Sequence, residues 1–508
     1  MSSSRALIHQ VGLVVMLMAL AKLGAFAKDV LLSLQFGAGP QTDAYFIANA
    51  IPGFVFGGVF ATIGLVFLPA FKRASADSDY EASVTYRTAA VSYSALSALL
   101  GALTFFGASF IVSTLAPELP RSTHDLAVTM TRILAFSFVF SGWVGLQSAV
   151  LQSHKVLIWP QLVQLLNHVF VIGGLAIAAL LDWAITVLAY AAVLGWMVMA
   201  PLVSRRSAAF WPKTRGPWFD GRKAIAMASL SFPVFLSLSM DQTSLLVGTY
   251  LGSAFPEGAI SHLNYAQRLM MLLSSVFALV IAYVLFPYLT ESIVANKPAQ
   301  ARRYMALAIV TVLLLSAPLL VLSVVMGEAF ISFIFQRGAF SQEDALAAGR
   351  VLTFFAPVIV LAGVREVLNR LFLAWQQTGA LLVFGVIAML SNVIASFYFS
   401  QTMGLEGIAL GASCGAFVYV LAQVIMVVAR HGTLLHRDLP LWLGLISLAV
   451  IVSALFGQWI GSRDFIGIAR LDFVADAILV IMVFAAVVAL PTFAFSRLRA
   501  IFETERMT

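Results

Sequence analysis

Long apolar runs dominate the chain, and polar residues gather in the short segments between them. A helix needs about 20 predominantly apolar residues to cross the hydrocarbon layer of a bilayer. Runs of that length predict an all-α polytopic membrane protein with about 14 membrane-spanning helices. We expect the spans at residues 8–35, 43–70, 84–113, 127–152, 156–180, 184–204, 222–251, 259–290, 302–325, 343–374, 379–401, 405–430, 439–460 and 473–496.

Composition agrees with this pattern. Hydrophobic residues make up 61% of the 508 positions and charged residues 10%, whereas a soluble protein carries about 25% charged residues. The single cysteine excludes an internal disulfide and a cysteine-based metal cluster. The net charge of +7 does not indicate nucleic-acid binding, because basic residues in the loops of membrane proteins set topology. We expect the protein to contact membrane lipids and no nucleic acid.

Basic residues are concentrated in alternate loops. One set of loops, which alternates correctly with both tails, is rich in lysine and arginine, and the opposite set is poor in them. Since cytoplasmic loops carry the excess of basic residues, both termini are expected in the cytoplasm. The rich set includes Lys72, Arg73, Lys155, Arg205, Arg206, Lys213 and Arg215, and the poor set holds Arg121, Arg337, Arg463 and Arg470.

The chain contains a faint internal repeat. The first span ends in LLSLQFGAG and the second contains VFATIGLVFLP, while the seventh ends in LLVGTYLGSA and the eighth contains VFALVIAYVLFP. An even number of spans separates the copies, so they share an orientation and predict two six-helix lobes related by a pseudo-two-fold axis along the membrane normal. The expected parts are an N-lobe (1–204), a cytoplasmic linker (205–221), a C-lobe (222–430) and two further spans with a tail (431–508).

Charged residues inside the first span are the best pointers to function. Lys22, Lys28 and Asp29 lie in an otherwise apolar stretch. A charge at membrane depth costs about 3 kcal/mol on insertion scales, so it faces a wet cavity or a partner. Two interpretations stay open: a Lys–Asp pair that neutralises itself between helices, or a basic cavity that attracts an anion.

Five other polar positions are candidates. Asp43 opens the second span, where it can cap a helix or take part in a site. Asp241 in the seventh span can hold Na⁺ or a proton, or pair with Arg268 in the eighth. Asn369, at the cytoplasmic end of the tenth span, is grouped with Asp241 as a possible cation site. Gln147 is expected to make interhelical hydrogen bonds.

Motifs of several enzyme classes are absent from the sequence. There is no HExxH, no nucleotide P-loop and no Gly-rich phosphate loop, and the seven histidines are scattered. We therefore expect no catalytic residues, no metal site and no cofactor, and coupling to Na⁺, H⁺ or the membrane potential. A basic cavity floor formed by Lys22, Lys28 and Arg268 would suit a phosphate or diphosphate, and apolar walls would suit a lipid tail.

Several segments, taken in order, resemble the MurJ/MviN family within the multidrug/oligosaccharidyl-lipid/polysaccharide exporter superfamily. The first two, FAKD (Phe26–Asp29) and FGAGPQTDAYF (Phe36–Phe46), resemble the opening of that family. The others are HKVLIWPQLVQLLN (His154–Asn167), NYAQRL (Asn264–Leu269), FQRGAFS (Phe335–Ser341) and GLEGIALGAS (Gly404–Ser413).

The resemblance implies 14 helices, two six-helix lobes and a cationic central cavity. It implies that the protein flips lipid II, the undecaprenyl-diphosphate precursor of peptidoglycan, from the cytoplasmic to the periplasmic leaflet by alternating access. We then expect a monomer in the bacterial inner membrane. By local match, Lys22 and Lys28 stand where the family usually has arginines, Arg268 and Asp43 match family positions, and Asp241 matches a sodium-site acid.

Two departures from the family keep other substrates open. Lysine at positions 22 and 28 keeps the charge of arginine but loses its bidentate fork. The second span, from Ile51 to Pro69, carries no charge where family members have a basic pair and an acid. The alternatives are a flippase for an exopolysaccharide or O-antigen lipid-linked unit, a cation-coupled drug antiporter of the same superfamily, and an integral-membrane glycan enzyme.

Overall fold

The computed structural model describes residues 2–214, 216–280, 286–295, 297–431, 438–461 and 469–494. Within these ranges a few side chains, that of Asp241 among them, are not described. Every regular element in the described ranges is helical, which confirms the predicted all-α class. Packing divides the chain into two units, residues 1–261 with 337–340, and residues 262–336 with 341–508.

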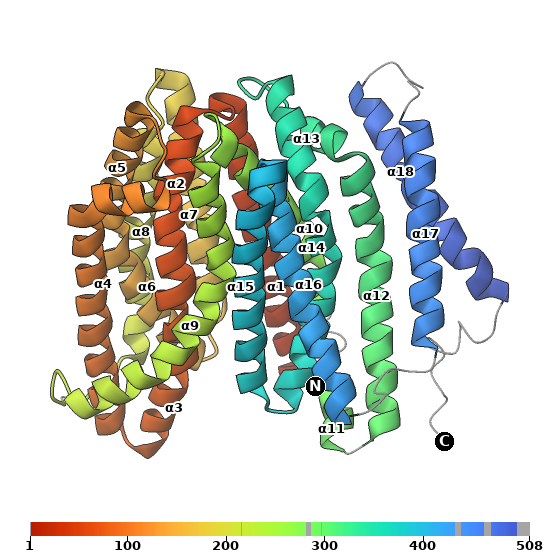
Figure 1. Cartoon of the computed structure of the whole chain (residues 1–508). Coiled ribbons are helices and arrows are strands. Elements are labelled where there is room, and N and C mark those ends of the chain that lie inside the picture. The colour runs from red at the N-terminus through yellow and green to blue at the C-terminus, as the bar shows by residue number, and fades with distance from the viewer. Residues whose placement is uncertain are drawn as a thin grey trace. The chain divides into compact units, whose positions relative to one another are not determined.

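In its described residues, the first unit contains nine α-helices and three irregular helical turns (Figure 1). They are α1 (Ser2–Phe36), α2 (Pro40–Phe54), η1 (Val55–Phe60), η2 (Ile63–Phe67), α3 (Leu68–Asp77), α4 (Asp79–Leu115), α5 (Arg121–Ala135), α6 (Ser137–Ser153), α7 (Ile158–Leu181), α8 (Thr186–Ser207), η3 (Ala208–Phe210) and α9 (Gly221–Gly252).

The second unit holds nearly all of the remaining described helices; the first residues of α10 are grouped with the first unit. They are α10 (Ala259–Val280), α11 (Phe286–Val294), α12 (Pro298–Val325), α13 (Gly327–Phe335), α14 (Gln342–Ala374), α15 (Thr378–Met403), α16 (Leu405–His431), α17 (Leu439–Ile460) and α18 (Ala469–Ala494).

Eleven helical segments of the described part of the chain are long and apolar enough to cross a membrane. Each of them coincides with a predicted span, and α1, α9 and α10 lie where the other three spans are predicted. The short helix α13 was not predicted, because nine residues are too few to register as a span. The lobe boundaries and the pseudo-two-fold axis stay predictions. Packing groups α9, the first helix of the predicted C-lobe, with the first unit.

The second span is irregular in the middle. It runs from α2 through the π-helical turns η1 and η2 into α3. Pro52 removes one backbone donor from this helix, and Gly57 and Gly58 follow within two turns. In η1, a side chain on Gly57 would meet the amide of Gln242 on α9 at 2.8 Å, so glycine permits this close packing.

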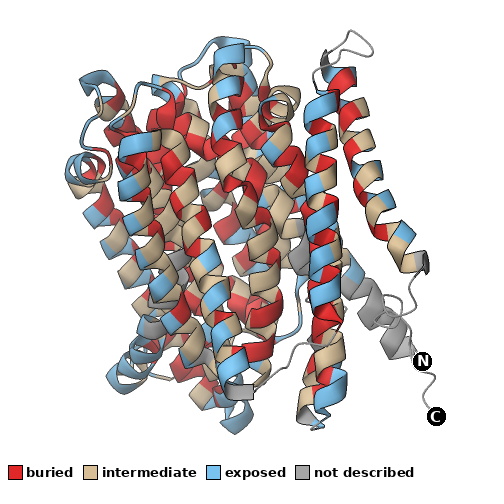
Figure 2. Cartoon of the chain, turned by 45° about the vertical axis from the view of Figure 1, so that its right-hand side comes forward, coloured by how far each residue is buried: buried red, intermediate tan, exposed pale blue. Residues whose placement is uncertain are grey.

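Burial follows the pattern of a membrane protein rather than that of a soluble one. Figure 2 shows buried residues on the helix faces that meet neighbouring helices, with exposed residues on the outer faces. Large apolar side chains stand outward on the helices, such as Phe106 on α4 and Leu180 on α7, each 82% exposed. A bilayer accepts such side chains without cost, whereas water does not. In the second unit, α15 and α16 pack so closely that a Cβ on Gly411 would lie 2.1 Å from Ser396 Oγ.

The linker between α8 and α9 is fastened to the first turns of α4. Arg87 on α4 donates to the Gly216 carbonyl at 2.6 Å and stacks over the Trp218 ring at 4.7 Å. The backbone amide of Asp220 donates to Thr88 Oγ1 at 3.0 Å. These contacts fix the point at which α9 begins beside α4.

A four-residue strap from the FQRGAFS segment belongs to the first unit, although the residues on either side of it belong to the second. The Ala339 amide donates to the Leu34 carbonyl, near the end of α1, at 2.8 Å. Gly338 has φ +57°, and a Cβ there would lie 2.2 Å from the same carbonyl oxygen. Only glycine fits this conformation and this approach.

Candidate substrate-binding site

Lys28 and Asp29 form a buried ion pair on α1. Lys28 Nζ lies 3.0 Å from Asp29 Oδ1, and their side chains are 11% and 2% exposed. The ammonium also lies 5.8 Å from the centre of the Tyr45 ring on α2. The structure therefore brings these two charges together as the self-neutralising interpretation requires. Tyr45 was missed by the sequence reasoning, because an aromatic residue in an apolar span carries no distinct signal.

Lys22 is placed differently from Lys28. It lies on the same helix, but its side chain is exposed, and among the described residues it makes no ion pair or hydrogen bond. Two residues after Lys22, Gly24 packs against α7: a Cβ on Gly24 would lie 3.5 Å from Leu165 and 3.8 Å from His168. An exposed lysine at membrane depth can bind an anion that enters from a cavity.

Asp43 holds the first turn of another helix. Its Oδ2 accepts from the Gly258 amide at 2.6 Å, and its Oδ1 accepts from the Ser261 amide at 2.7 Å and from the Ser261 hydroxyl at 2.6 Å. Asp43 is 3% exposed. From α2 it supplies a cap for α10, which is preceded by Gly258, a residue without a capping side chain. A negative group at a helix N-terminus is also favoured by the helix dipole.

The remaining predicted residues concern α9 and the second unit. Arg268 lies half-buried on α10, and the side chain of Asp241 on α9 lies outside the described residues. Asn369 on α14 accepts hydrogen bonds at Oδ1 from Gln423 Nε2 at 2.9 Å and from the Tyr419 hydroxyl at 3.3 Å, both on α16. The Asn369 oxygen thus faces α16 and accepts two hydrogen bonds from it. Among the described residues, no group of three or more acids, histidines or cysteines could hold a metal ion.

These side chains divide into two kinds. Lys28, Asp29 and Asp43 are buried and paired within the first unit, so they organise the protein. Lys22 is exposed and offers a positive charge, so it is the described residue of the first span best placed to meet an anionic group. These four residues do not form a catalytic arrangement.

Comparison with known proteins identifies the family. The sequence profile of "Lipid II flippase MurJ" matches residues 32–466, which is most of the chain. The chain belongs to the MurJ lipid II flippase family. MurJ proteins are transporters rather than enzymes, and the protein is a multi-pass membrane protein.

Relatives of the family match over most of their length. The lipid II flippase MurJ of Burkholderia cenocepacia is 24% identical over 477 residues, covering 87% of this chain and 89% of that protein. A probable lipid II flippase MurJ of Vibrio cholerae is 25% identical over 425 residues, covering 80% of each.

Solved structures show the same fold. A lipid II flippase MurJ in an inward closed conformation superposes with a TM-score of 0.81, covering 95% of this chain and 99% of that one at 22% identity. A multidrug resistance MATE transporter of the same superfamily, in an inward-facing conformation, gives a TM-score of 0.68 at 16% identity, covering 82% of this chain and 95% of that one. The predicted family and the fold of its members are therefore confirmed.

Proposed function

We propose that this protein flips lipid II across the bacterial inner membrane, from the cytoplasmic to the periplasmic leaflet. The observation that carries the proposal is the match of the MurJ profile to residues 32–466. Lipid II joins a diphosphate to a long isoprenoid chain, so its carrier needs a positive group at membrane depth. The exposed side chain of Lys22 supplies such a group.

The proposed mechanism is alternating access by a monomer, with both termini in the cytoplasm. Lys22 and Arg268 attract the diphosphate, and the absence of a nucleotide-binding motif leaves an ion gradient or the membrane potential as the energy source. Asp241 and Asn369 are proposed to hold the coupling cation. Moving one charge through the membrane potential supplies about 2.3 kcal/mol per 100 mV, which is enough to bias a two-state carrier.

A second candidate is a flippase for an exopolysaccharide or O-antigen lipid-linked unit. The observation in its favour is the second span, which has no charged residue from Ile51 to Pro69. The diphosphate and the isoprenoid chain are common to both classes of substrate, so Lys22 serves either. The sugar-binding part of the cavity would then distinguish them.

Complementation tests the proposal against this candidate. The gene is expressed in cells depleted of their own lipid II flippase, and in parallel in cells lacking an exopolysaccharide-unit flippase. Restored growth of the first strain supports lipid II as the substrate. Failure there, with the protein shown to be inserted in the membrane, contradicts it, and restored polysaccharide export in the second strain would establish the alternative.

A further inference from the structure

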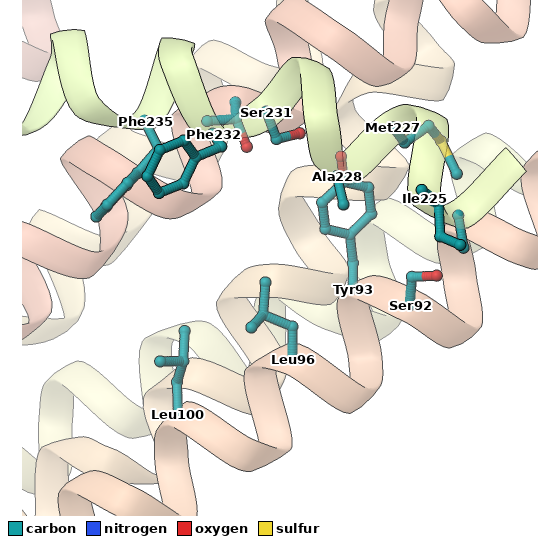
Figure 3. A pocket seen from close by; sticks show the side chains of 12 residues that line it. Ser92, Tyr93, Leu96, Leu100, Ile225, Met227, Ala228, Ser231, Phe232 and Phe235 are labelled. Atoms are coloured by element: carbon teal, nitrogen blue, oxygen red, sulfur yellow. The ribbon is translucent and has the colours of Figure 1, made fainter. Parts of the chain in front are cut away.

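An apolar cavity lies between α4 and α9 within the first unit. It has a volume of about 540 Å³, within the range of about 300–1,000 Å³ that small-molecule sites occupy. Figure 3 shows its two walls, with Tyr93, Leu96 and Leu100 on α4 and Ala228 and Phe235 on α9. We call this space the α4–α9 cavity. The other described residues that line it are Thr62, Ser92, Ala224, Ile225, Met227, Ser231 and Phe232.

The sequence of α9 explains why the two helices do not close on each other. Ala224, Ala228 and Ser231 follow a spacing of four and three, so these small side chains share one face of α9. At the start of α9, Lys223 Nζ holds α4 through Thr85 Oγ1 at 3.0 Å and through an ion pair with Glu81. The helices are therefore fastened at one end, and small residues leave a hollow beyond it.

Buried hydroxyl groups point to a ligand in this hollow. Tyr93 is 7% exposed, and its hydroxyl makes no hydrogen bond to the described residues, although the Ser231 hydroxyl on the opposite wall lies close to it. The hydroxyl of Ser92 is likewise buried and without a hydrogen bond among the described residues. Leaving one such group unsatisfied costs about 1–3 kcal/mol, so a ligand that offers an acceptor would be stabilised here.

The chemistry of the walls limits what this ligand can be. Among the described residues no charged side chain lines the cavity, so a phosphate group would not be neutralised inside it. The walls are mainly apolar, and the cavity is bordered by Ile225 and Phe232, which are 72% and 66% exposed. On a membrane protein such exposed apolar side chains face lipid. The part of the ligand inside the cavity is therefore apolar along most of its length, uncharged, and able to accept a hydrogen bond at one position.

We propose that the α4–α9 cavity binds an acyl chain of a membrane glycerophospholipid, with its ester carbonyl accepting a hydrogen bond from the Tyr93 hydroxyl. The polar residues Ser92 and Tyr93 precede Leu96 and Leu100 along α4, so the polar end of the cavity is nearer the start of that helix. A phospholipid has the same order, with the ester toward the membrane surface and the chain toward its centre. The bound chain fills the space that the small residues of α9 leave beside α4.

Photo-crosslinking tests this assignment directly. The full-length protein is reconstituted into bilayers that contain phosphatidylglycerol with a diazirine on one acyl chain, in an ester-linked and an ether-linked form. After illumination, labelled peptides are mapped by mass spectrometry. We expect labelling of residues 92–100 and 224–235, stronger for the ester than for the ether lipid.

Three variants make the test specific. Ala228→Trp fills the cavity and should reduce this labelling about tenfold, equivalent to about 1.4 kcal/mol. Leu103→Trp adds the same side chain at a position of α4 that is 58% exposed and outside the cavity, and should leave labelling unchanged. Tyr93→Phe removes only the hydroxyl and should lower ester-lipid labelling about fivefold, to the level of the ether lipid, as the loss of one neutral hydrogen bond predicts.

Labelling spread evenly over all exposed faces and unchanged by Ala228→Trp would overturn the proposal, because it would show surrounding bulk lipid only. Equal effects of Tyr93→Phe on the ester and ether lipids would overturn it as well, since no carbonyl would then be recognised. If Ala228→Trp does not give a folded protein, Tyr93→Phe carries the test by itself, since it removes one oxygen atom.

Discussion

Asp43 and Ser261, 218 residues apart in the chain, are joined by two hydrogen bonds: the carboxylate accepts from the Ser261 amide at 2.7 Å and from its hydroxyl at 2.6 Å. This contact ties the first turn of α2 to the first turn of α10. From the sequence, Asp43 can cap a helix or take part in a site, and it matches a family position. Its geometry in the structure supports a capping role, and its part in substrate binding stays a prediction.

Replacement of Asp43 should therefore lower the thermal stability of the protein, and any loss of transport should follow from that loss of stability. Asp43→Asn puts an NH₂ group against one of two backbone donors, and Asp43→Ala leaves both buried amides unsatisfied. Hydrogen bonds to charged groups contribute about 1.5–3 kcal/mol each, so both variants should lose at least several degrees of thermal stability in detergent. Asp77→Asn, at an exposed position, is the matched control. A stable Asp43→Ala protein that cannot transport would contradict the capping role.

The ion pair on α1 predicts a double-mutant cycle. Lys28→Ala removes the cation that lies 3.0 Å from the buried Asp29 carboxylate, and breaking a buried ion pair by removing one partner typically costs about 3–5 kcal/mol. Replacing both residues, as in Lys28→Met with Asp29→Leu, should recover most of this loss. Thermal unfolding of the two single variants and the double variant measures the coupling. Equal stability of Lys28→Ala and the wild type would show that the pair is not structural.

Gln147 is predicted to be a structural hub. It donates to the Tyr86 hydroxyl at 3.1 Å, and its Oε1 accepts from Ser207 at 2.7 Å and from Trp211 Nε1 at 3.0 Å. Gln147→Leu strands these buried partners, so we expect a loss of about 1–3 kcal/mol, read as a lower unfolding temperature. Gln152→Leu, five residues further along α6, is the control. A wild-type unfolding temperature for Gln147→Leu would mean that these groups find other partners.

Coupling to a cation makes a separate prediction. If Asp241 and Asn369 hold Na⁺, added Na⁺ should raise the unfolding temperature of the wild type more than the large cation N-methylglucamine does, because a ligand that binds only the folded state stabilises it. Asp241→Asn and Asn369→Ala should abolish this difference. A Na⁺ effect that persists in both variants would exclude these residues as the site.

Most of the fold could be predicted from the sequence, because the bilayer imposes a minimum apolar length on every span. The same pattern could not predict the π-helical turns η1 and η2 or the break at Phe136 between α5 and α6. These features depend on local backbone hydrogen bonding, which hydrophobicity does not report. The predicted interhelical bonds of Gln147 are confirmed, because a buried amide has few other ways to be satisfied.

The candidate site was less predictable than the fold. Sequence could name Lys22, Lys28 and Asp29 as charges at depth, but it could not say which of them is exposed. That difference depends on the rotation of α1 against its neighbours and on the position of Tyr45. The partners of Asp43 could not be found either, because Gly258 and Ser261 act mainly through backbone amides, which every residue but proline carries.

Lipid II translocation in reconstituted vesicles is the most direct test of the central claim. Purified protein is inserted into vesicles that contain fluorescent lipid II, and the fraction that becomes accessible in the opposite leaflet is followed with time. We predict that the wild type moves lipid II much faster than protein-free vesicles do, that Lys22→Arg retains this activity, and that folded Lys22→Ala loses it. Wild-type vesicles that move lipid II no faster than protein-free vesicles would contradict the account.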